Sequence, residues 1–130
     1  MNRLREGDYY LEPRYDHHKS FYGKAIVHPY FDGADLYSYG TWICSDMLKS
    51  GAQAVKLMPE LKDHENLNNG WHFCMVSAFW DYSATTLRHF KEFLAQYGYG
   101  HLSKRDIECH LRQCEDGNCY LVKSAWNELI

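Results

Sequence analysis

The feature that most constrains the fold is a helical apolar pattern late in the sequence. Apolar residues recur at intervals of three, four and three along one segment: Leu87, Phe90, Leu94 and Tyr97. This spacing places them on one face of a helix. Ser83 precedes the segment and can cap its first turn, and Gly98 follows it and can close the helix in the left-handed conformation. A helix from about residue 83 to 98 is therefore expected, with this apolar stripe buried.

The region before this helix is rich in β-forming residues. The stretch 21–28 reads as a strand, and Phe31-Asp32-Gly33-Ala34 follows as a turn whose Asp-Gly pair tolerates positive φ. The stretch 36–44 is expected to be the second arm of this hairpin, with Tyr37, Tyr39, Thr41 and Ile43 on its wetter face. Two further strands are predicted at 53–58, ending at Pro59, and at 71–76, with a polar loop at 62–70 between them.

The remaining segments complete a mixed architecture. Residues 1–19 show no lasting period and are expected to form an extended N-terminal arm. A second, shorter helix should begin after Ser103, which forms a capping-box pattern with Asp106, and should carry Ile107, Leu111 and Cys114 on one face. The tail 119–130 fits either a strand with a final helical turn or a short helix. The predicted fold is α+β, a single domain over 1–130 with a small antiparallel sheet packed against one main helix plus the shorter C-terminal helix.

Composition narrows the class of protein. The 130 residues are 45% apolar, which is enough for one hydrophobic core, and the net charge of −3 disfavours nonspecific coating of DNA. Residues 1–8 are polar and lead into no apolar run of targeting or membrane-spanning length, so a cytoplasmic protein without a membrane partner is expected. Five cysteines, an odd number, favour reduced thiols over a disulfide framework.

The histidines and cysteines are the candidate residues for metal binding or catalysis. Cys109, His110, Cys114 and Cys119 are possible zinc ligands, but Cys109 and Cys114 are five residues apart, whereas zinc motifs bring ligands in closer pairs. The other thiols, Cys44 and Cys74, lie in β-rich runs typical of a core and show no nucleophile signature. We therefore expect no metal, no cofactor and no enzymatic activity.

Hydroxyl groups gather where the main helix should begin, and Arg88 and His89 follow one turn later. Such a helix end attracts anions, so a phosphate or carboxylate of a partner could bind there. The simpler interpretation is that Ser83, Thr85 and Thr86 cap their own helix, which requires no ligand.

Aromatic residues make up 16% of the chain, which fits either a core of flat rings or a recognition surface. Tyrosine, tryptophan and arginine side chains carry much of the binding free energy at protein interfaces. The residues predicted to contact a partner combine such side chains with nearby basic and hydroxyl groups, including those at the start of the main helix: Tyr22, Lys24, Tyr37, Tyr39, Tyr82, Thr85, Arg88 and His89.

Three segments resemble a family of small uncharacterised proteins common in phages and mobile elements of Gram-positive bacteria. They are Ser-Phe-Tyr-Gly-Lys-Ala at 20–25, Leu-Tyr-Ser-Tyr-Gly-Thr at 36–41, and Tyr-Ser-Ala-Thr-Thr-Leu-Arg-His-Phe-Lys-Glu-Phe-Leu at 82–94. The resemblance covers about residues 20–105, whereas the stretch 49–69 and the cysteine-rich tail depart from it. It implies a compact accessory protein and names no activity.

Small acidic proteins of such accessory regions frequently inhibit host defence, and anti-CRISPR proteins are the best-known instance. By analogy with these accessory proteins, we expect a binding protein that inhibits a host defence complex in the cytoplasm of a bacterial host cell, such as an anti-CRISPR protein blocking a Cas nuclease with its guide RNA by protein–protein contact. Acidic residues around the hairpin, Asp32, Asp35 and Asp46, could face the basic groove of such a nuclease.

Two alternatives stay open. A single-stranded nucleic-acid-binding protein would stack bases on Tyr22, Tyr37 and Tyr39 and hold phosphates with Lys24 and Arg88, although the net charge opposes it. A metal-dependent enzyme would rely on His72, His89 and the cysteines, whose spacing does not favour it.

Overall fold

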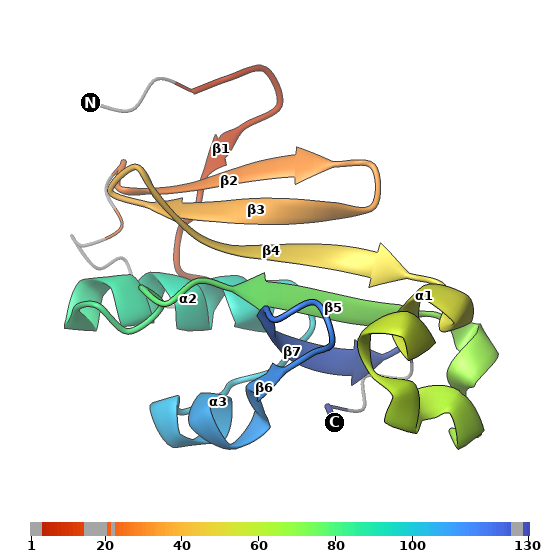
Figure 1. Cartoon of the computed structure of the whole chain (residues 1–130). Helices are drawn as coiled ribbons and strands as arrows, with labels where there is room; N and C mark the ends of the chain where they lie inside the picture. Colours follow the sequence, from red (N-terminus) through yellow and green to blue (C-terminus); the bar gives the residue numbers. More distant parts are fainter. Residues whose placement is uncertain (1–3, 15–20, 22, 126–128) are drawn as a thin grey trace.

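The structure is a computed structural model that describes residues 4–14, 21, 23–125 and 129–130. Its centre is one seven-stranded antiparallel sheet with the strand order β1-β2-β3-β4-β5-β7-β6 (Figure 1). The strands are β1 (Tyr9–Tyr10), β2 (Ala25–Tyr30), β3 (Gly33–Ser38), β4 (Thr41–Lys49), β5 (Trp71–Val76), β6 (Arg112–Gln113) and β7 (Cys119–Ser124). The helices are α1 (Gly51–Leu57), α2 (Ala84–Gln96) and α3 (Lys104–His110), with 3-10 turns η2 (Pro59–Asp63) and η3 (Leu67–Asn69).

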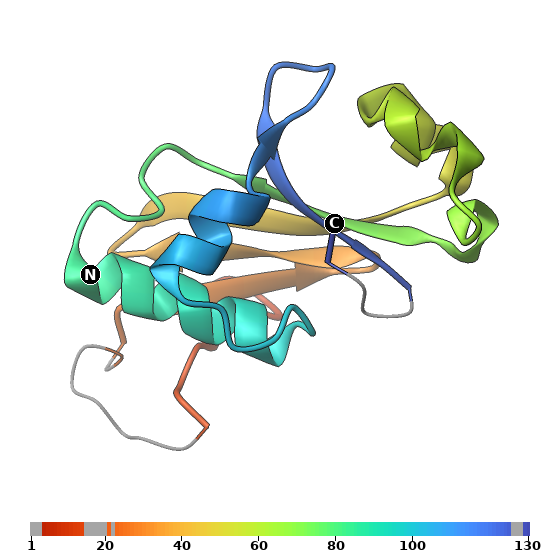
Figure 2. The same ribbon diagram turned by 90° about the horizontal axis from the view of Figure 1, so that it is seen from below.

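The expected α+β class is confirmed, but the sheet is larger than predicted and the helices are not confined to the C-terminal part. Helices α2 and α3 lie on one face of the sheet, whereas α1, η2 and η3 gather at the other end of β4 and β5 (Figure 2). Side chains alternate between the faces along β5, which sends Cys74 and Val76 into the core with α2 and Trp71 and Phe73 into a second core with α1. Within the described residues, no helix is long and apolar enough to cross a membrane.

Helix α2 forms where the apolar stripe predicted it. Ser83 caps the helix by accepting a hydrogen bond from the Thr86 backbone N–H at 3.0 Å, and Gly98 follows the helix with φ of 88°. Phe90 and Leu94 are buried as expected, while Leu87 is only partly buried against the same core. The stripe missed three further buried residues of α2: Thr86, His89 and Phe93.

The predicted second arm, 36–44, is interrupted by a turn. Strand β3 ends at Ser38 and β4 begins at Thr41, so Tyr39 and Gly40 form a two-residue turn in which both have positive φ, 52° and 81°. The turn breaks the alternation assumed across the whole stretch. Ile43, predicted on the wetter face, is therefore buried.

The hairpin of β2 and β3 also differs from its prediction. β2 starts at Ala25, and Phe31 and Asp32 connect it to β3, whose first residue is Gly33. The glycine is not needed for positive φ. A Cβ atom at Gly33 would lie 1.8 Å from the backbone oxygen of Asp46, so the close approach of β4 requires glycine there.

Several shorter segments were assigned correctly in part. The predicted strand 53–58 is wrong, because residues 51–57 form helix α1. Ser50 and Gln53 cap this helix reciprocally: the Gln53 backbone N–H donates to Ser50 Oγ at 3.2 Å, and the Ser50 backbone N–H donates to Gln53 Oε1 at 2.9 Å. The predicted strand 71–76 is confirmed as β5, and the loop 62–70 contains η3.

Helix α3 has the expected Ser103 capping box but ends at His110, so Cys114 lies beyond the helix and packs in the core with α1.

The chain termini join the sheet in the parts that are described. Tyr9 and Tyr10 of the expected N-terminal arm pair with β2, and Leu11 is buried, so this part of the arm belongs to the fold. For the tail, β7 confirms the strand alternative, and Leu129 forms a bridge with Lys123. The parts of these predictions at 1–3, 15–20 and 126–128 lie outside the described residues.

Candidate functional site

A pocket of about 520 Å³ lies beside the first turn of α2. Its walls come from three segments that are distant in the sequence: the β3–β4 turn, the connection from β5 to α2, and α2 itself. None of the described lining residues is charged: Ser38, Tyr39, Thr41, Ile43, Phe79, Tyr82, Ser83, Thr85 and Thr86. The pocket therefore suits an uncharged group, because nothing in this lining would neutralise a buried charge.

Three aromatic side chains form the rim of this pocket and are largely exposed. Tyr39 and Phe79 are each 53% exposed and Tyr82 is 78% exposed. The rings of Phe79 and Tyr82 meet edge to face, with 6.3 Å between their centroids. Isolated exposed aromatic residues are common, but a group of them around a pocket is typical of a binding site.

Tyr39 has a strained backbone at this rim. Among the described residues other than glycine, only Tyr39 has positive φ, at 52°. This conformation brings the Cβ atom of an L-residue close to the backbone and costs free energy. The Tyr39 ring lies 5.5 Å from Lys24 Nζ and 5.9 Å from the centroid of the His89 ring, and its backbone N–H donates to the Lys24 carbonyl.

Buried polar contacts support the pocket from below. Ser83 Oγ donates to Thr86 Oγ1 at 3.2 Å, and Thr86 Oγ1 lies 3.3 Å from Ser38 Oγ. Ser38 Oγ in turn hydrogen-bonds His89 Nδ1 at 2.7 Å. These contacts join β3 to α2 and hold the pocket wall in place, since buried polar groups that lose their partners destabilise the fold.

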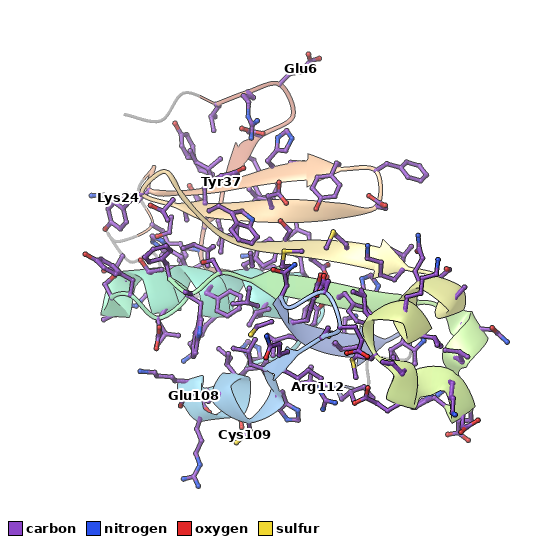
Figure 3. The ribbon with its side chains drawn as sticks, in the orientation of Figure 1. Glu6, Lys24, Tyr37, Glu108, Cys109 and Arg112 are labelled. Carbon is purple, nitrogen blue, oxygen red and sulfur yellow. The ribbon has the colours of Figure 1, made fainter. Side chains whose placement is uncertain are left out.

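The structure separates the eight predicted contact residues. Tyr39, Tyr82 and Thr85 line the pocket. Lys24, which is labelled in Figure 3, has its Nζ 5.5 Å from the centroid of the Tyr39 ring. His89 is fully buried next to Ser38, so it offers no surface to a partner and supports the pocket instead.

The other three predicted contact residues lie elsewhere. Arg88 lines a separate groove on the outer flank of α2. Tyr37 is half-buried and points to the sheet face opposite α2, because its neighbours Leu36 and Ser38 point toward α2. The Arg5 guanidinium lies 6.0 Å from the centroid of the Tyr37 ring. Tyr22 lies outside the described residues.

Comparison with protein-family models, with curated proteins and with solved structures found no match to this chain.

One of the acidic residues expected to face a basic groove is not available for that role. Asp46 is buried and accepts a hydrogen bond from Tyr99 at 2.6 Å, with His72 Nδ1 at 3.7 Å. Burial raises the pKa of the Tyr99 hydroxyl well above its usual value, and the Asp46 carboxylate adds to this effect. Burial also lowers the pKa of Lys123, against the opposing effect of Asp46. Asp46 thus belongs to an internal charge cluster, while Asp32 is exposed and Asp35 half-buried.

The histidines and cysteines of the described residues form no group of three or more with Asp or Glu that could hold a metal ion. Cys109 is exposed on α3, whereas Cys114 is buried, and burial raises the pKa of its thiol to about 11. Cys44 and Cys74 are fully buried side by side, and desolvation raises the pKa of both thiols. A thiol with a raised pKa is a weak nucleophile at neutral pH, as expected for core cysteines.

Phe79 is the rim residue that the sequence analysis missed. It belongs to a tight turn after β5, in which its backbone N–H donates to Ser77 Oγ at 3.2 Å. An apolar run of Ala78, Phe79 and Trp80 reads as a continuation of the strand. Only the polar residues around it, Ser77 and Asp81, indicate that the chain turns here.

Proposed function

We propose that this chain is a non-enzymatic binding protein that holds an apolar or aromatic side chain of a partner protein in the pocket between Tyr39, Phe79 and Tyr82. The observation that carries the proposal is the group of three exposed rings around an uncharged pocket of about 520 Å³. Aromatic residues around a pocket are the usual energetic centre of a protein interface. The buried contacts between Ser38, Thr86 and His89 keep the site rigid, which reduces the entropy lost on binding.

The resemblance to phage and mobile-element proteins supplies the class of partner. We propose a host defence complex, such as a CRISPR nuclease with its guide RNA, in the cytoplasm of a bacterial cell. The chain would act as an inhibitor, an anti-CRISPR protein, by occupying a surface of the nuclease. Exposed Asp32 and half-buried Asp35, on the β2–β3 hairpin, would add electrostatic attraction to a basic nuclease surface.

The test uses purified protein in cleavage assays with a panel of reconstituted CRISPR nucleases, together with capture of host proteins before and after nuclease treatment of the lysate. Replacing Tyr39 and Tyr82 by Ala should weaken binding to the inhibited enzyme at least tenfold, because truncated aromatic anchors typically cost about 2 kcal/mol or more. Phe31→Ala is the matched control, since Phe31 is a fully exposed ring on the β2–β3 turn.

Two results would contradict the proposal. One is that no nuclease in the panel is inhibited and no host protein is retained after nucleic acid is removed. The other is that Phe31→Ala weakens binding as much as the pocket variant, because the rings would then act only as general surface hydrophobicity. Thermal melts of each variant separate loss of binding from loss of folding.

A single-stranded nucleic-acid-binding protein is the second candidate, and one observation favours it. Lys24 lies 5.5 Å from the centre of the exposed Tyr39 ring, which places a cation beside a possible stacking surface. A labelled single-stranded oligonucleotide that binds tightly at physiological salt, and is released by Tyr39→Ala, would replace the protein-binding proposal. The net charge of −3 predicts weak binding instead.

A further inference from the structure

The pocket between Tyr39, Phe79 and Tyr82 is lined by hydroxyl groups as well as by rings. Five of the nine described lining residues carry an aliphatic hydroxyl: Ser38, Thr41, Ser83, Thr85 and Thr86. A lining that combines apolar surface with a few polar groups fixes the orientation of its ligand through those polar groups. The hydroxyls therefore bear on which side chain of a partner the pocket accepts.

Three of these hydroxyls already have partners within the chain. Ser83 Oγ accepts from the Thr86 backbone N–H at 3.0 Å and donates to Thr86 Oγ1 at 3.2 Å. Thr86 Oγ1 lies 3.3 Å from Ser38 Oγ, which hydrogen-bonds His89 Nδ1 at 2.7 Å. These three hydroxyls stabilise the pocket wall before any ligand binds.

The hydroxyls of Thr41 and Thr85 differ from the other three, because neither has a hydrogen-bond partner among the described residues. Thr85 is half-buried in the first turn of α2, and Thr41 is exposed at the start of β4. A hydroxyl on an open pocket wall is hydrated when the pocket is free. A purely apolar side chain would displace this water without replacing its hydrogen bonds, which costs binding free energy.

We propose that the pocket selects a tyrosine side chain of the partner, whose ring lies between the three rim rings and whose phenol hydroxyl binds Thr85 and Thr41. This inference rests on the proposed function, since it names the side chain that the pocket holds. A phenol hydroxyl both donates and accepts a hydrogen bond, as a threonine hydroxyl does, so either group can donate.

The other large apolar side chains match this lining less well. Phenylalanine and leucine have no polar atom to replace the displaced water. Tryptophan has one N–H group, which donates only and lies on the flank of its ring system. The tyrosine hydroxyl lies at the tip of the ring, so it reaches the wall while the ring remains in contact with the rim.

The experiment measures binding of four small probes to the isotope-labelled chain by NMR titration. The probes are the N-acetyl amides of tyrosine, phenylalanine, para-fluorophenylalanine and tryptophan. Backbone signals of Tyr39, Phe79 and Thr85 should move with each probe, because an aromatic ring enters the pocket in every case. The tyrosine probe should bind at least about threefold more tightly than each of the others, which is the effect of one net hydrogen bond. The para-fluoro probe is the sharpest comparison, because its fluorine has the position of the hydroxyl and cannot donate.

Thr85→Val removes the hydroxyl and keeps the branched shape of the side chain. It should abolish most of the preference for the tyrosine probe and leave the affinity of the phenylalanine probe unchanged. Thr41→Val should reduce the preference less, because Thr41 is more exposed, and it provides a second variant if Thr85→Val fails to fold. Ser45→Ala is the matched control, since it removes a half-buried hydroxyl of β4 that lies outside the described lining, and it should keep the full preference.

The outcomes separate this inference from the proposed function. Equal affinities of the tyrosine and phenylalanine probes would overturn the selection of tyrosine and leave an apolar anchor in the pocket. A para-fluoro or tryptophan probe that binds as tightly as the tyrosine probe would overturn it as well. So would a preference for tyrosine that survives in the double variant Thr85→Val with Thr41→Val. If no probe moves the signals of the pocket, both the inference and the proposed function are wrong.

Discussion

Truncation of Phe90 tests the packing on which the whole site depends. Phe90 projects from α2 into the core that joins the helix to the sheet, it is fully buried, and its ring centroid lies 5.9 Å from that of Trp80. Phe90→Ala removes the transfer free energy of the ring and leaves a cavity, which together cost about 3–5 kcal/mol. A domain of this kind has a total stability of roughly 5–15 kcal/mol, so the variant should remain folded only with a small margin.

The expected loss translates into a large change in the melting temperature. For a chain of this length, 1 kcal/mol corresponds to roughly 3–5 °C, so Phe90→Ala should melt about 10–25 °C lower. Circular dichroism is the appropriate assay, since it does not depend on the fluorescence of the neighbouring Trp80. Urea unfolding followed by the same signal should show a lower midpoint with an unchanged slope.

Phe31→Ala is the matched control for this prediction. It deletes the same ring from a fully exposed position and should change stability by less than about 0.5 kcal/mol. Equal melting temperatures for the two variants would refute the packing of α2 on the sheet, and with it the position of the pocket.

Three further predictions address the supports of the site and of the sheet. Ser38→Ala removes the partner of buried His89 Nδ1 and should cost about 1–3 kcal/mol in urea unfolding; a midpoint equal to that of the parent would contradict the buried contact. Gly33→Ala places a methyl group against the β4 backbone and should lower stability by about 1–3 kcal/mol or more in a thermal melt, whereas an unchanged melt would contradict the close approach. Burial alone would raise the pKa of Asp8, but its hydrogen bonds to His28 and to the Arg5 backbone N–H outweigh burial and lower it below 3.8. Stability from Asp8 is therefore present above about pH 4 and lost as pH falls further, so Asp8→Asn should flatten the acid limb of a melting-temperature profile, and an unchanged acid limb would count against the contact.

Helix positions were predictable because their signals are local. Ser83 and Gly98 mark the two ends of α2, and the Ser103–Asp106 capping box marks the start of α3. The same kind of signal was present for α1, in which Ser50 and Gln53 cap each other. The sequence prediction took Ser50-Gly51 as a break and 53–58 as a strand ending at Pro59, so it missed this cap and the helix that follows it.

The β3–β4 turn was not predictable from residue preferences. Two-residue turns with positive φ favour Asn-Gly or Asp-Gly. In Tyr39-Gly40 only the glycine matches this preference. The sheet imposes the turn, because β3 pairs with β4 through Leu36 with Cys44 and Ser38 with Thr41. A sequence read as one long strand cannot reveal this pairing.

The sequence predicted several residues of the candidate site, but it did not predict which of them lie together. Tyr39, Tyr82 and Thr85 were predicted as contact residues and line one pocket. Arg88 lies one turn after Ala84, and both residues line the hollow on the other flank of α2, whereas Thr85 and Thr86 line the pocket. Tyr37, only two residues before Tyr39, is separated from it by the turn and by the two faces of the sheet.

The strain at Tyr39 connects the fold to the proposed function. A tyrosine with positive φ costs about 1–2 kcal/mol relative to an ordinary conformation, whereas glycine would avoid this cost at that position. The cation–π contact of its ring with Lys24 stabilises the fold by about 0.5–1 kcal/mol at an exposed site. This contact offsets only part of the cost of the positive φ. About half of the surface of Tyr39 remains exposed, so burial of its side chain does not offset the rest of the strain. Asn or Gly would adopt this conformation with less strain, and a tyrosine held at the rim of a pocket is what the proposed contact with a partner requires.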